Sequence, residues 1–346
     1  MKYKSLGNTD LKVSLICLGT MTWGEQNTQE EAFDQMDYSI DQDVNFFDTA
    51  ELYAVPPKAE TYTKTETMIG NWFAARKNRD KIILATKVSG SGPSWIRGGG
   101  NQFTPENMTA ALEGSLKRLQ TDYVDLYQLH WPERTTNFFS KLGYRHNESE
   151  GDWTPFETIL ETAQKFLDQG KIRYLGLSNE TPYGLSKYLQ ISESKNLPRV
   201  VSVQNPYSLV NRTYEVGLAE MSIREQAGLL AYSPLAFGML SGKYLNNQMP
   251  EGSRLQLFGS HFPRYQGTRT QLAVEEYFKV AQKYNLSLAQ MSLAFVNAQP
   301  FVTSNIIGAT SMEQLKENIE SINLDLSDEI MEEINIIHEN NPSPAP

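Results

Sequence analysis

Short apolar runs alternate with longer amphipathic stretches along the chain of 346 residues. A run of four to eight apolar residues bounded by turn-forming residues is typical of a buried β-strand. We therefore expect strands over residues 15–18, 45–48, 82–87, 124–129, 172–177, 201–204, 229–232 and 303–307.

The stretches between these runs carry apolar residues at helical spacing. Ala32, Phe33, Met36 and Ile40, for example, recur with a period that places them on one helical face. A Thr-Pro pair at 104–105, and again at 154–155, predicts a capped helix start with proline in the first turn. Helices are expected over residues 29–41, 104–119, 153–169, 271–284 and 288–297.

Eight strands that alternate with helices predict an α/β fold, a parallel (β/α)8 TIM barrel. The alternative is an open, doubly wound sheet. Such a sheet normally carries a G-x-G-x-x-G loop after its first strand, whereas the first run here continues into LGTMTWGEQ. That motif occurs nowhere in the chain, which favours the barrel.

No linker or internal repeat divides the chain, so we expect one barrel domain over residues 1–346. Residues 1–6 and 11–13 flank four turn-forming residues, which predicts an N-terminal β-hairpin that could plug the bottom of the barrel. Two long loops, 89–103 and 131–152, are expected at the C-terminal face. The proline-rich tail, 340–346, is expected to be loose.

Composition narrows the class of function. The net charge is −10, and an acidic chain lacks the basic face that nonspecific nucleic-acid or anionic-membrane binding needs. Cys17 is the only cysteine, so no internal disulfide is possible, and we expect it in the core. No stretch resembles a signal peptide or reaches the roughly 18 apolar residues of a membrane span. We expect a cytoplasmic protein without nucleic-acid or membrane partners.

Four polar residues lie at or just beyond the ends of three consecutive predicted strands: Asp48, Tyr53, Lys87 and His130. The C-terminal ends of parallel barrel strands meet at one rim, where barrel enzymes place their active sites. A nearby ammonium group favours the phenolate and lowers the pKa of a tyrosine, and a carboxylate can hold that ammonium group in place. The set suits protonation of an oxygen that gains negative charge, with the histidine orienting a carbonyl group.

Other chemistries fit the sequence less well. There is no H-E-x-x-H, no cysteine pair and no clustered histidine spacing, so no metal site is expected. A G-x-S-x-G nucleophile elbow is also absent. Lys87 could form a Schiff base in an aldolase or lyase, but a neighbouring Asp48 would keep it protonated. The simplest alternative is a structural salt bridge between Asp48 and Lys87.

The segments FDTAELY, ILATK and QLHWP closely resemble the signatures of the aldo-keto reductases. The stretches GKIRYLGLSNE, VQNPYSL, YSPLAFGMLSGKY and IIGATSMEQLKENI resemble that family's cofactor segments, in matching order. The resemblance implies an NADP(H)-dependent oxidoreductase that reduces aldehydes or ketones to alcohols. It implies that Tyr53 is the proton donor, that Lys87 and Asp48 tune it, and that His130 positions the carbonyl.

The same resemblance implies a set of cofactor-binding residues. Ser178, Asn179 and Gln204 would hold the nicotinamide carboxamide, and Tyr232 would stack on its ring. Lys243 and Arg254 would be the basic groups for the phosphates. The remaining implied residues are Thr20 at the first strand, Ser233, Pro234, Leu235, Ala236 and Gly238 along the pyrophosphate, and Gly308, Thr310, Gln314, Glu317 and Asn318 around the adenosine.

Two features leave alternatives open. Many family members carry a lysine–serine pair before the last cofactor helix, and residues 307–310 contain no base here. The potassium-channel β-subunit branch also lacks that lysine and is associated with NADP, with a basic group from the seventh loop, a place that Arg254 could fill. Resemblance to that branch implies, as the alternative function, an NADP-binding regulatory or interaction protein with little turnover.

The sequence indicates the class of substrate but does not identify the substrate itself. Trp23, Trp95 and Trp131, with Tyr53, could form an aromatic pocket mouth suited to carbonyl compounds with apolar substituents. No heptad or long apolar helix face predicts a dimer, so the oligomeric state stays open.

Overall fold

The structure, a computed structural model, describes residues 1–99 and 101–346. Gly100, in the predicted long loop 89–103, lies outside the described residues. Within them, eight parallel strands close into a barrel in the order β10-β3-β4-β5-β6-β7-β8-β9. The barrel strands are β3 Ile16–Gly19, β4 Phe46–Asp48, β5 Ile83–Val88, β6 Val124–Leu129, β7 Ile172–Ser178, β8 Val200–Pro206, β9 Gly228–Tyr232 and β10 Val302–Ile307.

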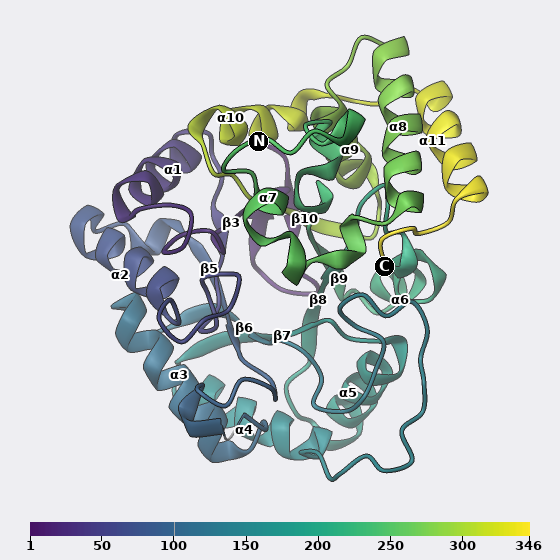
Figure 1. Cartoon of the computed structure of the whole chain (residues 1–346). Coiled ribbons are helices and arrows are strands. Elements are labelled where there is room, and N and C mark those ends of the chain that lie inside the picture. Colours follow the sequence, from purple (N-terminus) through teal and green to yellow (C-terminus); the bar gives the residue numbers. More distant parts are fainter. Residues whose placement is uncertain (100) are drawn as a thin grey trace.

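The α-helices surround the strands as an outer ring, except the short α7, which lies over the end of the barrel (Figure 1). They are α1 Gln29–Asp41, α2 Lys64–Arg76, α3 Pro105–Leu119, α4 Phe156–Asp168, α5 Pro182–Lys195, α6 Leu218–Arg224, α7 Arg254–Phe258, α8 Thr268–Lys283, α9 Leu288–Ala298, α10 Met312–Glu320 and α11 Asp328–Asn340. Short 3-10 helices are η1 Arg79–Lys81, η2 Arg97–Gly99, η3 Thr213–Val216, η4 Ala236–Ser241, η5 Leu245–Asn247, η6 Gly259–His261, η7 Pro263–Tyr265 and η8 Ser321–Asn323. The (β/α)8 prediction is confirmed, and each strand boundary lies within two residues of its predicted place.

The N-terminal hairpin closes the bottom of the barrel. Its strands, β1 Tyr3–Ser5 and β2 Lys12–Ser14, pair antiparallel. Leu6 and Val13 are fully buried and share an apolar cluster with Cys17, Phe46 and Leu126 inside the barrel. Burial of this apolar surface fills the interior below the active rim, as packed barrels require. Cys17 is thus a core residue, and burial holds the pKa of its thiol well above the usual value.

Helix starts follow local capping chemistry. Thr28 and Glu31 form a capping box at α1, and Thr104 caps α3 with Pro105 in the first turn. The predicted start of α4 is wrong. Thr154 caps no helix, because its N–H and its hydroxyl both donate to the carboxylate of Glu133, and α4 begins at Phe156 instead.

The prediction of a loose tail is also wrong. Ala345 is fully buried, and its N–H donates to the carbonyl oxygen of Val210 at 3.0 Å. The hydroxyl of Ser343 accepts from the N–H of Arg212 at 3.1 Å. A proline-rich composition does not make a segment flexible, because the proline ring fixes one backbone angle. Hydrogen bonds to the rest of the protein decide whether such a segment is held in place.

Candidate active site

The predicted quartet converges at the C-terminal rim of the barrel. Asp48 is the last residue of β4, Lys87 lies near the end of β5, and His130 directly follows β6. The Nζ of Lys87 donates to Asp48 Oδ2 at 2.7 Å, to the carbonyl oxygen of Thr49 at 2.8 Å and to the Tyr53 hydroxyl at 3.0 Å. The His130 ring meets the Tyr53 ring edge-on, with 5.7 Å between their centroids.

A second layer of amides holds the carboxylate in place. Asp48 Oδ1 accepts from the side-chain amides of Gln128 at 3.1 Å and Gln204 at 2.8 Å. Gln204 also donates to the amide oxygen of Gln128 at 3.1 Å. Gln128 was not predicted, although its position two residues before His130 on an all-buried strand marks it as an interior polar residue. The carboxylate therefore has both oxygens satisfied and does not rotate away from Lys87.

Burial sets the protonation states of the quartet. Burial alone would lower the pKa of Lys87, but Asp48 and Tyr53 outweigh it, so this pKa lies above its ordinary value. Burial raises the pKa of Tyr53, and Lys87 offsets this only in part. Burial, together with Lys87, holds the pKa of His130 well below 6.5. At neutral pH the site thus presents an ammonium group, a phenol and a neutral imidazole.

This result corrects one expectation and supports another. The sequence led us to expect a lowered pKa for Tyr53, but desolvation of the phenolate outweighs the neighbouring positive charge. A phenol that keeps its proton at neutral pH remains a proton donor. The Schiff-base alternative is disfavoured, because a buried, ion-paired Lys87 retains the proton that an attacking amine must lose.

A cavity of about 1020 Å³ opens beside the quartet and extends across the rim. Most of the predicted residues line it: Thr20, Asp48, Tyr53, His130, Trp131, Ser178, Asn179, Gln204, Tyr232, Ser233, Pro234, Leu235, Gly238, Lys243, Arg254, Gly308, Thr310, Gln314, Glu317 and Asn318. Lys87 is fully buried beneath Tyr53 and does not line the cavity. Ala236 is also fully buried, with its N–H donated to the carbonyl oxygen of Ser233.

Two of the three predicted pocket tryptophans lie elsewhere. Trp23 is fully buried in the core, and its indole N–H donates to Gln35 on α1. Trp95 packs edge-on against Tyr62, outside the cavity lining. Trp131 does line the cavity, and its indole N–H donates to the carbonyl oxygen of Ser91 at 3.0 Å. A tryptophan supplies so much apolar surface that core burial competes with any role at a pocket mouth.

The middle of the cavity carries a chain of amide contacts. The Tyr232 hydroxyl donates to Asn179 Oδ1 at 2.7 Å, and Asn179 Nδ2 donates to the carbonyl oxygen of His130 at 2.8 Å. The hydroxyl of Ser178 donates to the carbonyl oxygen of Gln204 at 2.9 Å. These contacts place side-chain amides beside an aromatic ring, a set that can hold a planar ring with a carboxamide.

One end of the cavity is positively charged. Among the described residues, neither Lys243 nor Arg254 forms an ion pair with a carboxylate. Arg254 stacks over the Phe237 ring at 4.8 Å and donates from Nε to Gln26 at 3.3 Å. Burial lowers the pKa of Arg254 to about 10, so the guanidinium stays charged at neutral pH. Cations without a carboxylate partner fit the phosphates of a dinucleotide.

The stretch 308–318 supplies polar side chains, one of them the carboxylate of Glu317, to the same end. Thr310 donates from its N–H and from its hydroxyl to Gln314 Oε1, and Asn318 donates to the carbonyl oxygen of Gly308 at 3.1 Å. Glu317 accepts from the hydroxyl of Ser287 at 2.6 Å. This stretch contributes no basic group to the cavity lining. Of the predicted cofactor residues, Lys243 and Arg254 therefore carry the positive charge at this end.

The comparison with known proteins now decides the family. The sequence pattern of the Aldo/keto reductase family matches residues 15–339. The chain belongs to the aldo/keto reductase family. It is 49% identical to Protein tas of Escherichia coli strain K12 over 348 aligned positions, which cover all of both chains. It is 34% identical to the uncharacterized oxidoreductase YrpG of Bacillus subtilis strain 168, over 97% of this chain and 96% of that protein.

A further relative, an aldo-keto reductase of Babesia bovis, is 38% identical over 75% of this chain and 96% of its own length. The likeness to the bacterial Tas protein is also what the stretches GTMTWGEQN, AVPP and ESINLDLS lead one to expect, and it is confirmed. Membership of the aldo/keto reductase family supports a general oxidoreductase role for the chain.

In this family member, sequence reasoning missed the apolar side of the cavity. Met21, Leu52, Val55, Phe138 and Phe139 line it close to Tyr53 and Trp131. These residues come from loops after β3, β4 and β6. The one available signal was the pair of adjacent phenylalanines inside the otherwise polar stretch 131–152. A polar loop that carries two neighbouring large apolar side chains is expected to pack them against another part of the protein.

Two further observations bear on the site. Residues 1–99 and 101–346 contain no group of three or more histidine, cysteine, aspartate or glutamate side chains that could hold a metal ion. Among these same residues, no helix combines the length and the apolar character needed to cross a bilayer.

Proposed function

We propose that this chain is an NADP(H)-dependent oxidoreductase that reduces aldehydes or ketones to alcohols, with Tyr53 as the proton donor. The observation that carries the proposal is the three-way contact of the Lys87 ammonium group, which binds Asp48, Thr49 and the Tyr53 hydroxyl at the edge of a large cavity. A bound nicotinamide cofactor supplies the hydride that adds to the carbonyl carbon.

The chain's own residues supply the proton and the orientation. As negative charge develops on the carbonyl oxygen, the phenol of Tyr53 is the nearest acid that retains a proton at neutral pH. Lys87 stabilises the phenolate that remains, because its ammonium group lies 3.0 Å from that oxygen. The neutral ring of His130 faces the same space and can donate a hydrogen bond to the substrate oxygen.

The part of the cavity wall next to Tyr53 favours an uncharged substrate. Up to residue 140, and within the described residues, the only charged side chain in the lining is Asp48, which Lys87 already neutralises. Met21, Trp131 and Phe138 present apolar surface around this space. An aldehyde or ketone with apolar substituents gains from burial against this part of the wall. Within the described residues, the one nearby cation of the later lining that contacts Tyr232 is Arg264.

The cationic end supports a phosphorylated dinucleotide, and Arg254 supports NADP(H) over NAD(H). A dianionic 2′-phosphate gains most from a forked guanidinium, and Arg254 has no carboxylate partner in the described part of the chain. Lys243 adds a second positive charge at the same end of the cavity.

The test is Tyr53→Phe, assayed by NADPH oxidation across a panel of aldehydes, ketones and quinones. We expect kcat to fall by about 10²- to 10⁴-fold, the usual contribution of a positioned general acid. NADPH affinity, measured by fluorescence quenching, should stay nearly unchanged because the hydroxyl acts mainly in the transition state.

Tyr62→Phe is the matched control. It removes a hydroxyl that donates to Glu51 in the same loop, at 3.3 Å and outside the cavity lining. It should leave kcat close to that of the unaltered protein. Near-normal reduction by Tyr53→Phe would refute the assigned role. Tight NADPH binding without turnover of any panel member would favour the regulatory alternative.

A further inference from the structure

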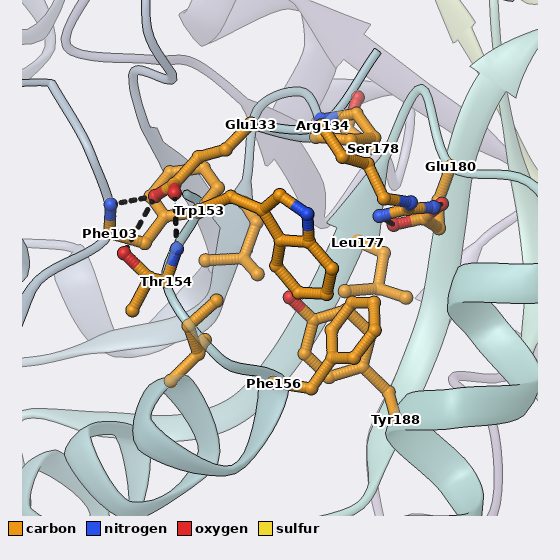
Figure 2. Close-up of a pocket in the computed structure, with 13 residues that line it drawn as sticks. Phe103, Glu133, Arg134, Trp153, Thr154, Phe156, Leu177, Ser178, Glu180 and Tyr188 are labelled. Atoms are coloured by element: carbon orange, nitrogen blue, oxygen red, sulfur yellow. Dashed lines mark hydrogen bonds and ion pairs between the residues drawn. The ribbon is translucent and has the colours of Figure 1, made fainter. Parts of the chain in front are cut away.

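A buried ion pair lies directly behind one wall of the large cavity. It lies beside a small hollow of about 10 Å³. Figure 2 shows residues that line this hollow, among them Ser178, Trp153, Phe156 and Tyr188. Ser178 also lines the large cavity, so the two spaces share a wall. Nothing in the proposed chemistry uses the side chains on this side of the wall.

The ion pair joins Arg134 to Glu180. Arg134 NH1 donates to Glu180 Oε2 at 3.1 Å, and NH2 donates to Oε1 of the same carboxylate. The side chains are 10% and 4% exposed, respectively. The guanidinium also lies over the rings of Phe156 and Tyr183, at 5.4 and 5.7 Å. A two-pronged contact enclosed by aromatic rings fixes both side chains in one geometry.

On one side, the pair holds the segment that carries Asn179. The side-chain amide of Asn205 binds both the N–H and the carbonyl oxygen of Glu180, at 3.0 and 2.8 Å. Asn179, the preceding residue, has a left-handed backbone (φ 53°), and its amide joins the His130 carbonyl oxygen to the Tyr232 hydroxyl. Glu180 is thus fixed one residue from the link between the two halves of the cavity.

On the other side, the pair holds the base of the loop 131–154. Glu133, next to Arg134, accepts from the N–H of Thr154 and the N–H of Phe103, which are the ends of both long loops (Figure 2). From this base the loop reaches over the cavity, where Phe138 and Phe139 line it. Residues 141–149, beyond them, are exposed.

We propose that Arg134 and Glu180 are positioning residues. Their ion pair holds the loop 131–154 over the cavity and fixes its position relative to Asn179. The inference rests on the proposed carbonyl reduction for its kinetic consequence, but the locked loop itself is independent of turnover. Loss of the pair should free Phe138 and Phe139 from the cavity wall and weaken substrate binding.

The experiment compares Arg134→Gln with a matched control, Arg79→Gln. Arg79 forms a similar buried pair with Asp125 at 2.8 Å and lies over the ring of Tyr123, but it is at the opposite end of the barrel. Both variants should lower the melting temperature. Only Arg134→Gln should raise KM for the carbonyl, with a loss in kcat/KM on the order of 10- to 100-fold for a misplaced binding wall. The Kd for NADPH should change much less.

A second readout needs no substrate. Amide hydrogen exchange, followed by mass spectrometry of peptides within 131–154, should be faster in Arg134→Gln and unchanged in Arg79→Gln. If the unaltered protein reduces no carbonyl compound, the proposed function fails while this exchange experiment still tests the locked loop.

A milder variant covers the case in which Arg134→Gln does not fold. Arg134→Lys keeps the charge but loses the fork, and should give a smaller rise in KM and in exchange. The exchanged pair, Arg134→Glu with Glu180→Arg, should recover part of the loss. Normal KM and normal exchange in a folded Arg134→Lys or Arg134→Gln protein would overturn the proposal, as would equal effects of Arg79→Gln.

Discussion

At the scale of single residues, Lys87 organises the site. A fully buried ammonium group is costly unless its donors are satisfied, and here three oxygens accept from it. The geometry that makes the charge tolerable is the same geometry that binds the Tyr53 hydroxyl. Burial and function are therefore not separable at this position, because any change that unpairs Lys87 also releases the phenol.

Arg254 gives the residue-scale prediction for cofactor choice. Arg254→Ala should weaken NADPH binding by roughly 10- to 100-fold, the equivalent of ~1.5–3 kcal/mol for hydrogen bonds to a charged group. NADH binding should change far less, since NADH lacks the 2′-phosphate that a guanidinium binds in fork geometry. Fluorescence titration with both cofactors measures the two dissociation constants.

Arg224→Ala serves as the control, because Arg224 is exposed on α6 and pairs with the equally exposed Glu220. It should leave both constants unchanged. If Arg254→Ala weakens NADPH and NADH binding equally, the guanidinium binds the pyrophosphate that both cofactors share and not the 2′-phosphate.

The residues that sequence reasoning located are those whose place follows from strand ends. Asp48, Lys87 and His130 end apolar runs, so barrel topology alone brings them together. Gln128 and Phe138 were missed, because interior amides and loop aromatics reveal their partners only in three dimensions. Trp23 was predicted at the pocket mouth because its neighbours in the sequence are typical of a loop. In the structure it is buried in the core, where Gln35 accepts the hydrogen bond from its indole N–H.

At the scale of elements, periodicity and capping predicted α1, α3, α4, α8 and α9 to within three residues of their observed bounds, and a long-range contact accounts for the late start of α4. α4 begins later than predicted because Glu133, 21 residues before Thr154, binds the capping hydroxyl. No local pattern encodes a competitor at that separation. The fold was predictable because strand spacing is local, whereas loop anchoring is not.

The contact between α2 and α3 provides an element-scale prediction. A Cβ added at Gly70 would lie 1.9 Å from the carbonyl oxygen of Arg118. Gly70→Ala should therefore destabilise the fold by about 1–3 kcal/mol, the usual cost of overpacking, even though alanine favours a helix over glycine by ~1 kcal/mol. Urea denaturation followed by circular dichroism measures the change.

Gly114→Ala on α3 is the matched control, since the atom nearest to its added Cβ would be the NH1 of the Arg118 side chain, at 2.8 Å, and not a backbone atom. This variant should cost less than Gly70→Ala, because the Arg118 guanidinium, although bound to Glu66 and Ser115, can shift where a backbone carbonyl oxygen cannot, and helix propensity favours alanine. Equal stability of the two variants would mean that α2 and α3 separate at little cost.

At the scale of the whole molecule, the two ends of the barrel are built differently. The hairpin seals the bottom with apolar side chains, while the top opens into a cavity of about 1020 Å³. Loops from the first half of the chain supply the quartet and the apolar wall, and segments from residue 178 onward supply the amides and cations. For the proposed carbonyl reduction, this division puts the reacting carbon where the two halves meet, between Tyr53 and Tyr232.

The C-terminal tail gives the last prediction, because it ties together segments that are distant in sequence. Besides the contacts of Ser343 and Ala345, the carbonyl oxygen of Pro344 accepts from the Thr270 hydroxyl on α8 at 3.2 Å. Each such hydrogen bond contributes about 1 kcal/mol net, against an ordering cost that the three prolines reduce. Deleting 342–346 should lower stability by roughly 1–3 kcal/mol and the melting temperature by a few degrees.

Ser343→Ala separates the tail's docking from its mere presence. It removes the hydroxyl that accepts from the Arg212 N–H, so it should produce a fraction of the loss seen on deletion. Deleting Pro346 alone should produce a smaller loss, because it removes only a long contact, 3.5 Å, from Arg264 NH1 to its carbonyl oxygen. Calorimetry of the three variants gives this ranking directly. If the full deletion melts at the same temperature as the intact chain, the hydrogen bonds merely balance the entropy of ordering, and the tail adds nothing to the link between α8 and the loop after β8.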